Sequence, residues 1–543
     1  MIAGQHGRQI GLAQSSIFSI GALWLIAFVT RLATALPMNV PGYMDAYYYF
    51  VGAQRLVEGY GLTEPYLWNY LGPVQTLPAP AFQFWLPLTS FIMWPFLVAF
   101  GVTFRAGQMP FIILSSFLPL IAYRVGRILG LSSRGALTAG LLTTFAPFYI
   151  KYWVATDNFT PFALIGSLSL LAMWHAIRRG QLAWYALAGA LVGLSHWARA
   201  DAPLLLITLL LVAIWGHNET QPRPARPRPF ATLAGWLVAV GGYLAVISPW
   251  YLYTYLISGR LASAGAQSIF LTSYDDLYSY GKPLTWHTYW AWGLGPILQS
   301  KLQAAGANLI TVMVVFLSAF LAPFVALEMW IRRRELLVRL VALYGVLLYL
   351  TMTLIFTFPG PRGSLLHSGS ALLPFLLPLA VCGLERSVDW VAQRRSTWDS
   401  VLAKRVFSAG AVALCMVLSA FIYARALWAS GDASQAWNTR DEGYRLAGVW
   451  LAARGVPAET PVLVGNPPAF YYYTRRYALA IPNGPPDTVA EVCQRFGARY
   501  LLLELNRPAP LDALWDGRQE HPALSEVYRW TGSWQARLYA CRP

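Results

Sequence analysis

The fold is decided by an apolar stretch, SSIFSIGALWLIAFVTRLATAL at residues 15–36, and by the loop after it, GYMDAYYYFVGAQRLVEGYG at residues 42–61. The apolar stretch is long enough to cross a hydrocarbon core of about 30 Å as one helix. The loop is polar and rich in tyrosine, and it carries Asp45 just beyond the end of that helix. A carboxylate at the mouth of an apolar bundle predicts chemistry at the membrane surface rather than simple anchoring.

The composition extends this interpretation to most of the chain. Of the 543 residues, 57% are hydrophobic and only 12% are charged, which excludes an ordinary soluble domain. Further apolar runs recur as far as about residue 423, and they are too apolar, with connections too long, for the strands of a membrane barrel. The sequence therefore predicts an α-helical polytopic membrane protein.

The formal net charge of +16 is concentrated in short connections between the apolar runs. The positive-inside rule places these connections in the cytoplasm, and their alternation with spans argues against a nucleic-acid groove. The basic residues concerned are Arg124, Arg127, Arg134, Arg178, Arg179, Arg223, Arg226, Arg228, Arg332, Arg333, Arg334, Arg339, Arg386, Arg394, Arg395, Lys404 and Arg405.

Topology follows from this sidedness. With Arg8 inside, the first span ends outside and the Asp45 loop is external. A full crossing by the apolar residues 82–104 would put the next basic cluster outside. We therefore expect an interfacial or re-entrant segment there, broken by Pro87 and Pro95.

The remaining runs complete about eleven transmembrane helices, with interfacial helices in the first external loop and an external C-terminal tail. The expected spans are residues 15–36, 106–126, 135–153, 159–177, 182–197, 201–216, 230–252, 306–331, 337–357, 366–384 and 406–424. The outer side then receives residues 37–105, 154–158, 253–305 and 358–365. The two spans around HWARAD, residues 196–201, are short, so this hairpin tip is expected below the outer surface.

The tail has the composition of a soluble domain. VPAETPVLVGN predicts a strand, and TVAEVCQRFGARYLLLE predicts a helix followed by a buried strand. We expect a membrane domain over residues 1–425 and a small α/β extracytoplasmic domain over residues 429–543. Cys493 and Cys541 fall in the tail, where a disulfide is permitted, and the sequence leaves open whether they pair.

Two acids are candidates for catalysis. Asp45 precedes a helix-like stretch, and Asp157, followed by Asn158, lies at the outer end of the span at 135–153. Each could simply cap a helix. Together, beside an aromatic loop open to lipid, they suit deprotonation of an acceptor hydroxyl. Arg199 and Asp201 could form an ion pair at the hairpin tip, and we favour structural pairing over direct catalysis because buried charges need partners.

In these motifs the chain resembles the GT-C superfamily of glycosyltransferases, specifically the bacterial relatives of protein O-mannosyltransferases and of the lipid A aminoarabinose transferase (glycosyltransferase family 39). The matching features, in order, are MDAYYYFVGAQRLVEGYG, Asp157 with Asn158, GLSHWARADAPLLL and FPGPRGSLLHSGSALLPFLLPLA. The resemblance implies a GT-C type fold in the bacterial plasma membrane. It also implies a polyprenyl-phosphate sugar donor, used at the outer face in an inverting single displacement.

The resemblance also implies roles for the acids. Asp45 would match the catalytic acid of the first loop, where many members carry an Asp-Glu pair and this chain has Ala46 instead. Asp157 would orient the acceptor or, as in the related oligosaccharyltransferases, help to hold a divalent cation. Two separated carboxylates without an obvious third ligand make a weak metal site, so we expect no metal cofactor.

The phosphate of such a donor must be neutralised where water is scarce, a task that suits arginine. Arg362, with His367 shortly after it, is the first candidate for binding the donor phosphate, and Lys282 is the second. The alternatives are a snorkelling anchor for Arg362 and a satisfied polar residue for His367. Asn158, Arg199 and Asp201 would support the site.

Membrane lipids and an acceptor protein, lipid or glycan are the remaining partners that we expect. The tail segment NPPAFYYYTRRYALAIPNG, with Arg475 and Arg476, is predicted to dock onto the first loop or onto lipid headgroups. Two other classes stay open: a transporter or flippase of lipid-linked sugars, which should show internal repeats of spans, and a non-catalytic scaffold. The sequence does not reveal the sugar, the acceptor or the oligomeric state.

Overall fold

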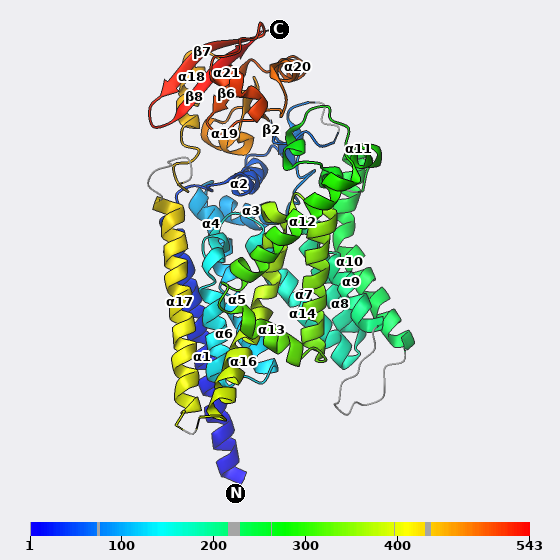
Figure 1. Cartoon of the computed structure of the whole chain (residues 1–543), viewed down its shortest axis with the longest axis vertical. Helices are drawn as coiled ribbons and strands as arrows, with labels where there is room; N and C mark the ends of the chain where they lie inside the picture. Colours follow the sequence, from blue (N-terminus) through cyan, green and yellow to red (C-terminus); the bar gives the residue numbers. More distant parts are fainter. Residues whose placement is uncertain are drawn as a thin grey trace.

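A computed structural model describes residues 2–72, 76–214, 229–261, 263–395, 397–428 and 436–542, with side chains from residue 19 onward and, after the second gap, from residue 233. Arg223, Arg226, Arg228 and the start of the tail at 429–435 lie outside the described residues, as does the side chain of Arg8. Figure 1 shows a long bundle of helices with a small sheet domain at one end. The C-terminus lies in that domain and the N-terminus lies at the opposite end.

The bundle is that of a multi-pass membrane protein. Among the described residues, six helical segments are long and apolar enough to cross a membrane, and five shorter apolar helices accompany them. The long segments are Phe104–Ile128, Phe159–Arg179, Leu233–Ser258, Leu336–Ile355, Gly360–Ala392 and Ser400–Trp428. The shorter helices are Ser19–Ala35, Leu88–Phe100, Leu182–Ala198, Leu204–Ile214 and Ala322–Ile331.

The helices of the bundle follow the apolar runs of the sequence closely. Their bounds are α1 Ile2–Ala35, α4 Phe104–Ser115, α5 Leu118–Ile128, α6 Ser133–Thr144, α7 Phe159–Arg179, α8 Leu182–Ala198, α9 Leu204–Ile214, α10 Pro229–Ser258, α12 Leu294–Ile310, α13 Ala322–Ile331, α14 Leu336–Leu350, α15 Leu365–Gly369, α16 Leu373–Ala392 and α17 Ser400–Trp428.

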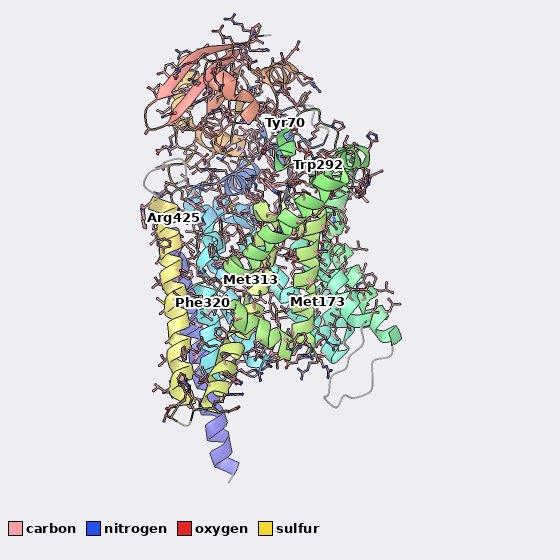
Figure 2. The ribbon with its side chains drawn as sticks, viewed as in Figure 1. Tyr70, Met173, Trp292, Met313, Phe320 and Arg425 are labelled. Carbon is pink, nitrogen blue, oxygen red and sulfur yellow. A yellow bond between two sulfur atoms is a disulfide. The ribbon has the colours of Figure 1, made fainter. Side chains whose placement is uncertain are left out.

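Several expected spans are not continuous helices; the span at 106–126, for example, is divided into α4 and α5 by a turn at Ser116 and Phe117. The span at 135–153 is only α6, which ends at Thr144 and is followed by two 3₁₀ turns, because Pro147 cannot continue the helical hydrogen bonding. The span at 306–331 is interrupted between α12 and α13 by the π-helix Thr311–Phe316 and a turn. Met313 and Phe320 mark this interruption about halfway along the bundle in Figure 2.

The apolar segment at 82–104 contains α3, Leu88–Phe100. Its 13 residues reach about 20 Å, which is too short for a hydrocarbon core of about 30 Å. It packs against α2, Met44–Val57, at the end of the bundle next to the sheet domain (Figure 1). The prediction of a segment that does not cross agrees with this length, but the predicted break at Pro95 is wrong because α3 continues through it.

The sheet domain has six strands in the order β2-β5-β4-β6-β8-β7. The strands are β2 Tyr66–Leu67, β4 Val462–Val464, β5 Ala478–Ala480, β6 Tyr500–Glu504, β7 Leu524–Thr531 and β8 Gln535–Cys541, with the helices α18 Tyr444–Ala453, α19 Pro467–Thr474 and α20 Pro486–Phe496. β2 belongs to the loop between α1 and α4 and pairs in parallel with β5, so the loop and the tail share one sheet. The sequence did not indicate that the loop contributes a strand to the sheet of the tail.

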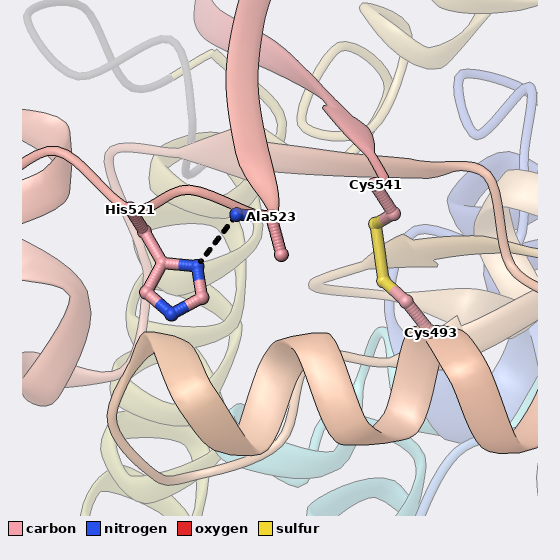
Figure 3. Close-up of a disulfide and its surroundings, with 4 residues drawn as sticks. All are labelled: Cys493, His521, Ala523 and Cys541. Carbon is pink, nitrogen blue, oxygen red and sulfur yellow. Dashed lines mark hydrogen bonds between the residues drawn. A yellow bond between two sulfur atoms is a disulfide. The ribbon is translucent and has the colours of Figure 1, made fainter. Parts of the chain in front are cut away.

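A disulfide between Cys493 and Cys541 ties α20 to β8 (Figure 3). In the same view, the Ala523 N–H donates to His521 Nδ1 at 3.3 Å, at the turn that leads into β7. The pairing of the two cysteines that the sequence left open is therefore present in the structure.

Candidate functional site

Asp45 and Asp157 meet at the end of the bundle that faces the sheet domain. Asp45 lies in the first turn of α2, and Asp157 lies just before α7. Tyr43 occupies the N-cap position of α2 and Asn158 that of α7, so neither acid serves as the cap residue. The ligand atoms of Asp45, Asp157 and His367 all lie within 4.8 Å of one another. The structure therefore unites the two predicted catalytic acids and adds a histidine to them.

Asp157 is fully buried and is held by hydrogen bonds to both of its oxygens. Tyr43 Oη donates to Oδ2 at 2.6 Å, and the backbone N–H of Asn158 donates to Oδ1 at 2.6 Å. His367 Nε2 lies 3.1 Å from Oδ2. A carboxylate with this many donors is stabilised in its ionised form, which is what a buried acid requires.

The orientation of His367 constrains the charge of the cluster. Its Nδ1 lies 2.8 Å from the carbonyl oxygen of Gly363, and because a carbonyl only accepts, Nδ1 carries the hydrogen. Nε2 then faces Asp157 at 3.1 Å and Asp45 at 4.0 Å. A bare lone pair there would oppose two carboxylates, so Nε2 needs either a proton or a cation. The ring is stacked on Phe159, with 3.7 Å between centroids.

The same cluster separates the pKa values of the two acids. Burial, followed by the negative charge of Asp157, raises the pKa of Asp45 to about 7, although its side chain keeps 28% exposure. Burial alone would also raise the pKa of Asp157. The charge and hydrogen bond of His367, with the bonds from Tyr43 and Asn158, instead hold that pKa below its ordinary value. Asp157 therefore stays ionised while Asp45 titrates near neutral pH.

Arg199 and Asp201 form the ion pair that we expected at the hairpin tip, with 3.0 Å between Nε and Oδ1. Both also bond to Ser368 Oγ, and Arg199 Nη2 donates to the carbonyl of Ser364 at 3.3 Å. Ser368 follows His367 directly on α15. The pair thus anchors the segment that carries His367.

Asn158 joins three elements around the acids. Its Nδ2 donates to Tyr49 Oη at 3.1 Å and to the carbonyl of Ala198 at 3.5 Å. Since Tyr49 lies on α2 and Ala198 ends α8, this amide fixes α7 against both helices. Asn158 thus contacts the helix that carries Asp45 and the end of the helix that precedes Arg199.

The two candidate cations differ in their surroundings. Arg362 is exposed, with its Cζ 5.0 Å from the ring centroid of Tyr274, and within the described ranges no carboxylate pairs with it. Burial, and then the charge of Asp45, raises the pKa of Tyr274 to about 12. Lys282 instead bonds to Asp276 at 2.6 Å and to Thr272 at 3.0 Å. Its charge is already compensated.

Sequence reasoning misplaced one contributor to the site and missed two others. It placed His367 with Arg362 rather than with the acids, because 210 residues separate His367 from Asp157. It gave Tyr43 no individual role. It also overlooked Trp437, which packs on Tyr43 at 5.3 Å between ring centroids and donates to the carbonyl of Val40. Only the tyrosine-rich composition of the first loop hinted at these contacts.

Comparisons with known proteins agree with this architecture. Residues 80–253 match the family described as dolichyl-phosphate-mannose-protein mannosyltransferase. No curated protein matches the chain in sequence. Among solved structures, the oligosaccharyltransferase AglB from Archaeoglobus fulgidus, in complex with an inhibitory peptide and a dolichol-phosphate, is similar with a TM-score of 0.55 and 11% identity, over 96% of this chain and 74% of AglB.

ArnT from Cupriavidus metallidurans is similar over nearly its whole length. In the apo state it has a TM-score of 0.53 and 12% identity, over 98% of each chain. Bound to undecaprenyl phosphate it has a TM-score of 0.52 and 11% identity, again over 98% of each chain. The chain therefore shares its fold with AglB and ArnT, and its residues 80–253 are similar to the mannosyltransferase family.

Proposed function

We propose that this protein is an inverting glycosyltransferase that moves a sugar from a polyprenyl-phosphate donor to an acceptor hydroxyl at the outer face of the bacterial plasma membrane. The observation that carries the proposal is the pairing of Asp45, whose pKa is raised to about 7, with the ionised and buried Asp157. Paired carboxylates with separated pKa values are typical of acid–base sites.

In the proposed reaction the Asp45 carboxylate accepts the proton of the acceptor hydroxyl. The hydroxyl oxygen forms a bond to the anomeric carbon, the bond from that carbon to the phosphate oxygen breaks, and polyprenyl phosphate leaves with the electron pair. A base whose pKa lies near the working pH is well matched to this transfer. Asp157 keeps the pKa of Asp45 raised and orients Tyr43 and His367.

The phosphate that leaves gains negative charge as the bond breaks. Arg362 is suited to stabilise that charge, because its guanidinium is exposed, lacks a carboxylate partner within the described ranges and is steadied by the ring of Tyr274. Lys282 is the weaker candidate because Asp276 already binds it. The apolar helices around this end of the bundle would accept the polyprenyl chain.

We further propose that His367 carries a proton on Nε2 and that the enzyme works without a metal. The imidazolium would supply the positive charge that two facing carboxylates require. Asp45, Asp157 and His367 also fit a divalent cation, which would supply Lewis-acid assistance at the phosphate. Arg362 can supply that assistance without a metal.

Several observations support the sidedness and the donor class. The basic clusters that include Arg332 and Arg386 are remote in sequence from the carboxylates and belong to connections that the positive-inside rule assigns to the cytoplasm. The sheet domain would then be extracytoplasmic, with residues 1–425 as the catalytic membrane domain and 429–543 as the domain that shapes acceptor choice. Structures of AglB with a dolichol-phosphate and of ArnT with undecaprenyl phosphate support a lipid-phosphate donor.

The test is turnover by the purified full chain in proteoliposomes. A panel of polyprenyl-phosphate sugars is supplied, and free polyprenyl phosphate and the anomeric configuration of the product are measured with and without a chelator. We expect release of polyprenyl phosphate, inversion of configuration and no effect of the chelator. Movement of labelled donor across the bilayer without release would indicate a transporter, and retention of configuration would contradict the single displacement.

A further inference from the structure

A cavity of about 560 Å³ lies between the first external loop, the turn from α3 to α4 and the sheet domain. This volume is in the range of ligand sites in proteins. Phe50 and Gln54 of α2 form one wall, and Tyr472 and Tyr473 of α19 form another. The cavity therefore closes only when the sheet domain is docked on the first loop.

The cavity is separate from the carboxylates. Gln54 follows Asp45 by nine residues on the same helix, and at 3.6 residues per turn the two side chains point about 180° apart. Asp45 faces His367 and Asp157, whereas Gln54 faces the cavity. A ligand held here would occupy the opposite side of α2 from the proposed reaction.

Arg105 contributes the first of three guanidinium groups. It is held by neutral oxygens, since Nη1 donates to the carbonyl of Ala35 and to Gln108, and Nη2 donates to the carbonyl of Leu36 and to Asn39. These bonds fix the guanidinium at the outer end of α1 without neutralising its charge. Within the described ranges, no carboxylate pairs with it.

The sheet domain contributes the other two guanidinium groups, those of Arg445 and Arg475. Arg445 of α18 is exposed and lies over the ring of Tyr473, with Cζ 5.2 Å from the centroid, and no carboxylate among the described residues pairs with it. Arg475 pairs with Glu58 at 3.0 Å. It ends α19 in the left-handed conformation, with φ of 59°, a position that usually takes glycine.

We propose that this cavity binds a phosphate monoester group presented on a lipid headgroup or on a soluble ester. Two arginines without carboxylate partners match the double negative charge of a phosphate monoester, and the planar guanidinium suits its oxygens. The adjacent tyrosine rings would cover the organic part of the headgroup. Because Arg105 comes from the membrane region and Arg445 from the sheet domain, one bound anion bridges the two.

Exposed apolar side chains flank the residues that line this cavity. Leu36 and Phe100, at the ends of α1 and α3, are both exposed apolar side chains, and both are near in sequence to residues that line the cavity. An apolar rim beside a basic cavity suits an amphipathic ligand whose chain remains in the bilayer. The lipid-borne ester is therefore the source that we expect to bind more tightly.

The experiment measures binding to the detergent-purified full chain by calorimetry. Lysophosphatidic acid is the lipid-borne probe, and glycerol 3-phosphate is the same headgroup without the acyl chain. Arg445→Gln removes one guanidinium from the cavity. Arg454→Gln is the matched control, because Arg454 ends the same helix, is also exposed and also stacks on an aromatic ring, that of Trp450, but lies outside the cavity.

We expect lysophosphatidic acid to bind, with its affinity lowered about tenfold by Arg445→Gln and unchanged by Arg454→Gln. Arg445→Lys should restore part of the loss. Equal binding of glycerol 3-phosphate would support the site and assign it to soluble esters. Failure of both probes to bind, or equal weakening by the two glutamine variants, would overturn the proposal.

A further variant separates this site from the proposed enzyme. Asp45→Asn should leave the binding of lysophosphatidic acid intact, because Asp45 lies on the other side of α2. Loss of turnover with unchanged binding would confirm two independent sites. Loss of binding in Asp45→Asn would show that the cavity belongs to the reaction site and would contradict the separation argued here.

Discussion

Replacing Asp45 by asparagine should stop sugar transfer while leaving the protein folded. Asparagine has the same shape but cannot accept the proton of an acceptor hydroxyl. Asp45 contributes little to the stability of α2, because Tyr43 occupies the N-cap position and the side chain of Asp45 is still 28% exposed. Its interaction with the N-terminus of the helix is worth about 0.3–1 kcal/mol.

The two effects therefore differ in size. Loss of a general base lowers the rate by about 10²- to 10⁴-fold, which is about 3–5 kcal/mol in the activation barrier. The free energy of unfolding should change by less than about 1 kcal/mol. Removing the charge of Asp45 also relieves its repulsion with Asp157, which further limits any loss of stability.

The assay is release of polyprenyl phosphate from the donor identified in the turnover experiment, together with the thermal unfolding midpoint in the same detergent. Asp487→Asn serves as the control, since that acid of the sheet domain is 88% exposed and remote in sequence from both acids of the site. A rate within about threefold of the unmodified protein would be too small a change for a lost base and would refute the assignment of Asp45.

Three further predictions concern the same site. Because burial and the charge of Asp157 raise the pKa of Asp45 to about 7 and the ionised form is the base, kcat/KM should rise as the pH increases through about 7, and a flat pH–rate profile would count against it. Tyr43→Phe removes the 2.6 Å hydrogen bond from Tyr43 to Asp157, so the pKa of Asp157 should rise and turnover should fall about tenfold. Turnover is measured alongside the unfolding midpoint, and unchanged turnover would exclude a role for this bond. Arg362→Gln should raise KM for the donor about tenfold and Lys282→Gln far less, because Asp276 already binds Lys282, and equal effects in initial-rate kinetics would contradict this ranking.

The helical architecture was largely readable from the sequence. The expected span at 159–177 corresponds to α7, Phe159–Arg179, and the span at 182–197 corresponds to α8, Leu182–Ala198. Apolar length is a property of one segment against the bilayer, so it needs no knowledge of the rest of the chain. The prediction of a continuous helix was wrong where a proline interrupts the backbone hydrogen bonds, as at Pro147, before which the helical part of one expected span ends early.

The residues of the candidate site were only partly predictable. Asp45 and Asp157 stood out because both were expected at the outer ends of apolar spans, beside a loop rich in tyrosine. Which residues surround them was not readable: Tyr43 and His367 contact Asp157 from positions 114 and 210 residues away in the sequence. Such contacts depend on how helices pack, and many packings satisfy the same hydropathy pattern.

The sequence by itself determined the membrane class and the approximate spans, because hydropathy acts on each segment separately, and it predicted an outer location for the two acids. Only the tertiary structure decided that His367 completes the cluster of carboxylates, that Lys282 is taken by Asp276, and that Tyr66 of the first loop pairs with Ala478 in the sheet of the tail. The first and the third are contacts between segments distant in the sequence, which form only when the whole chain has packed, whereas Lys282 and Asp276 are six residues apart and their pairing depends on how one loop folds.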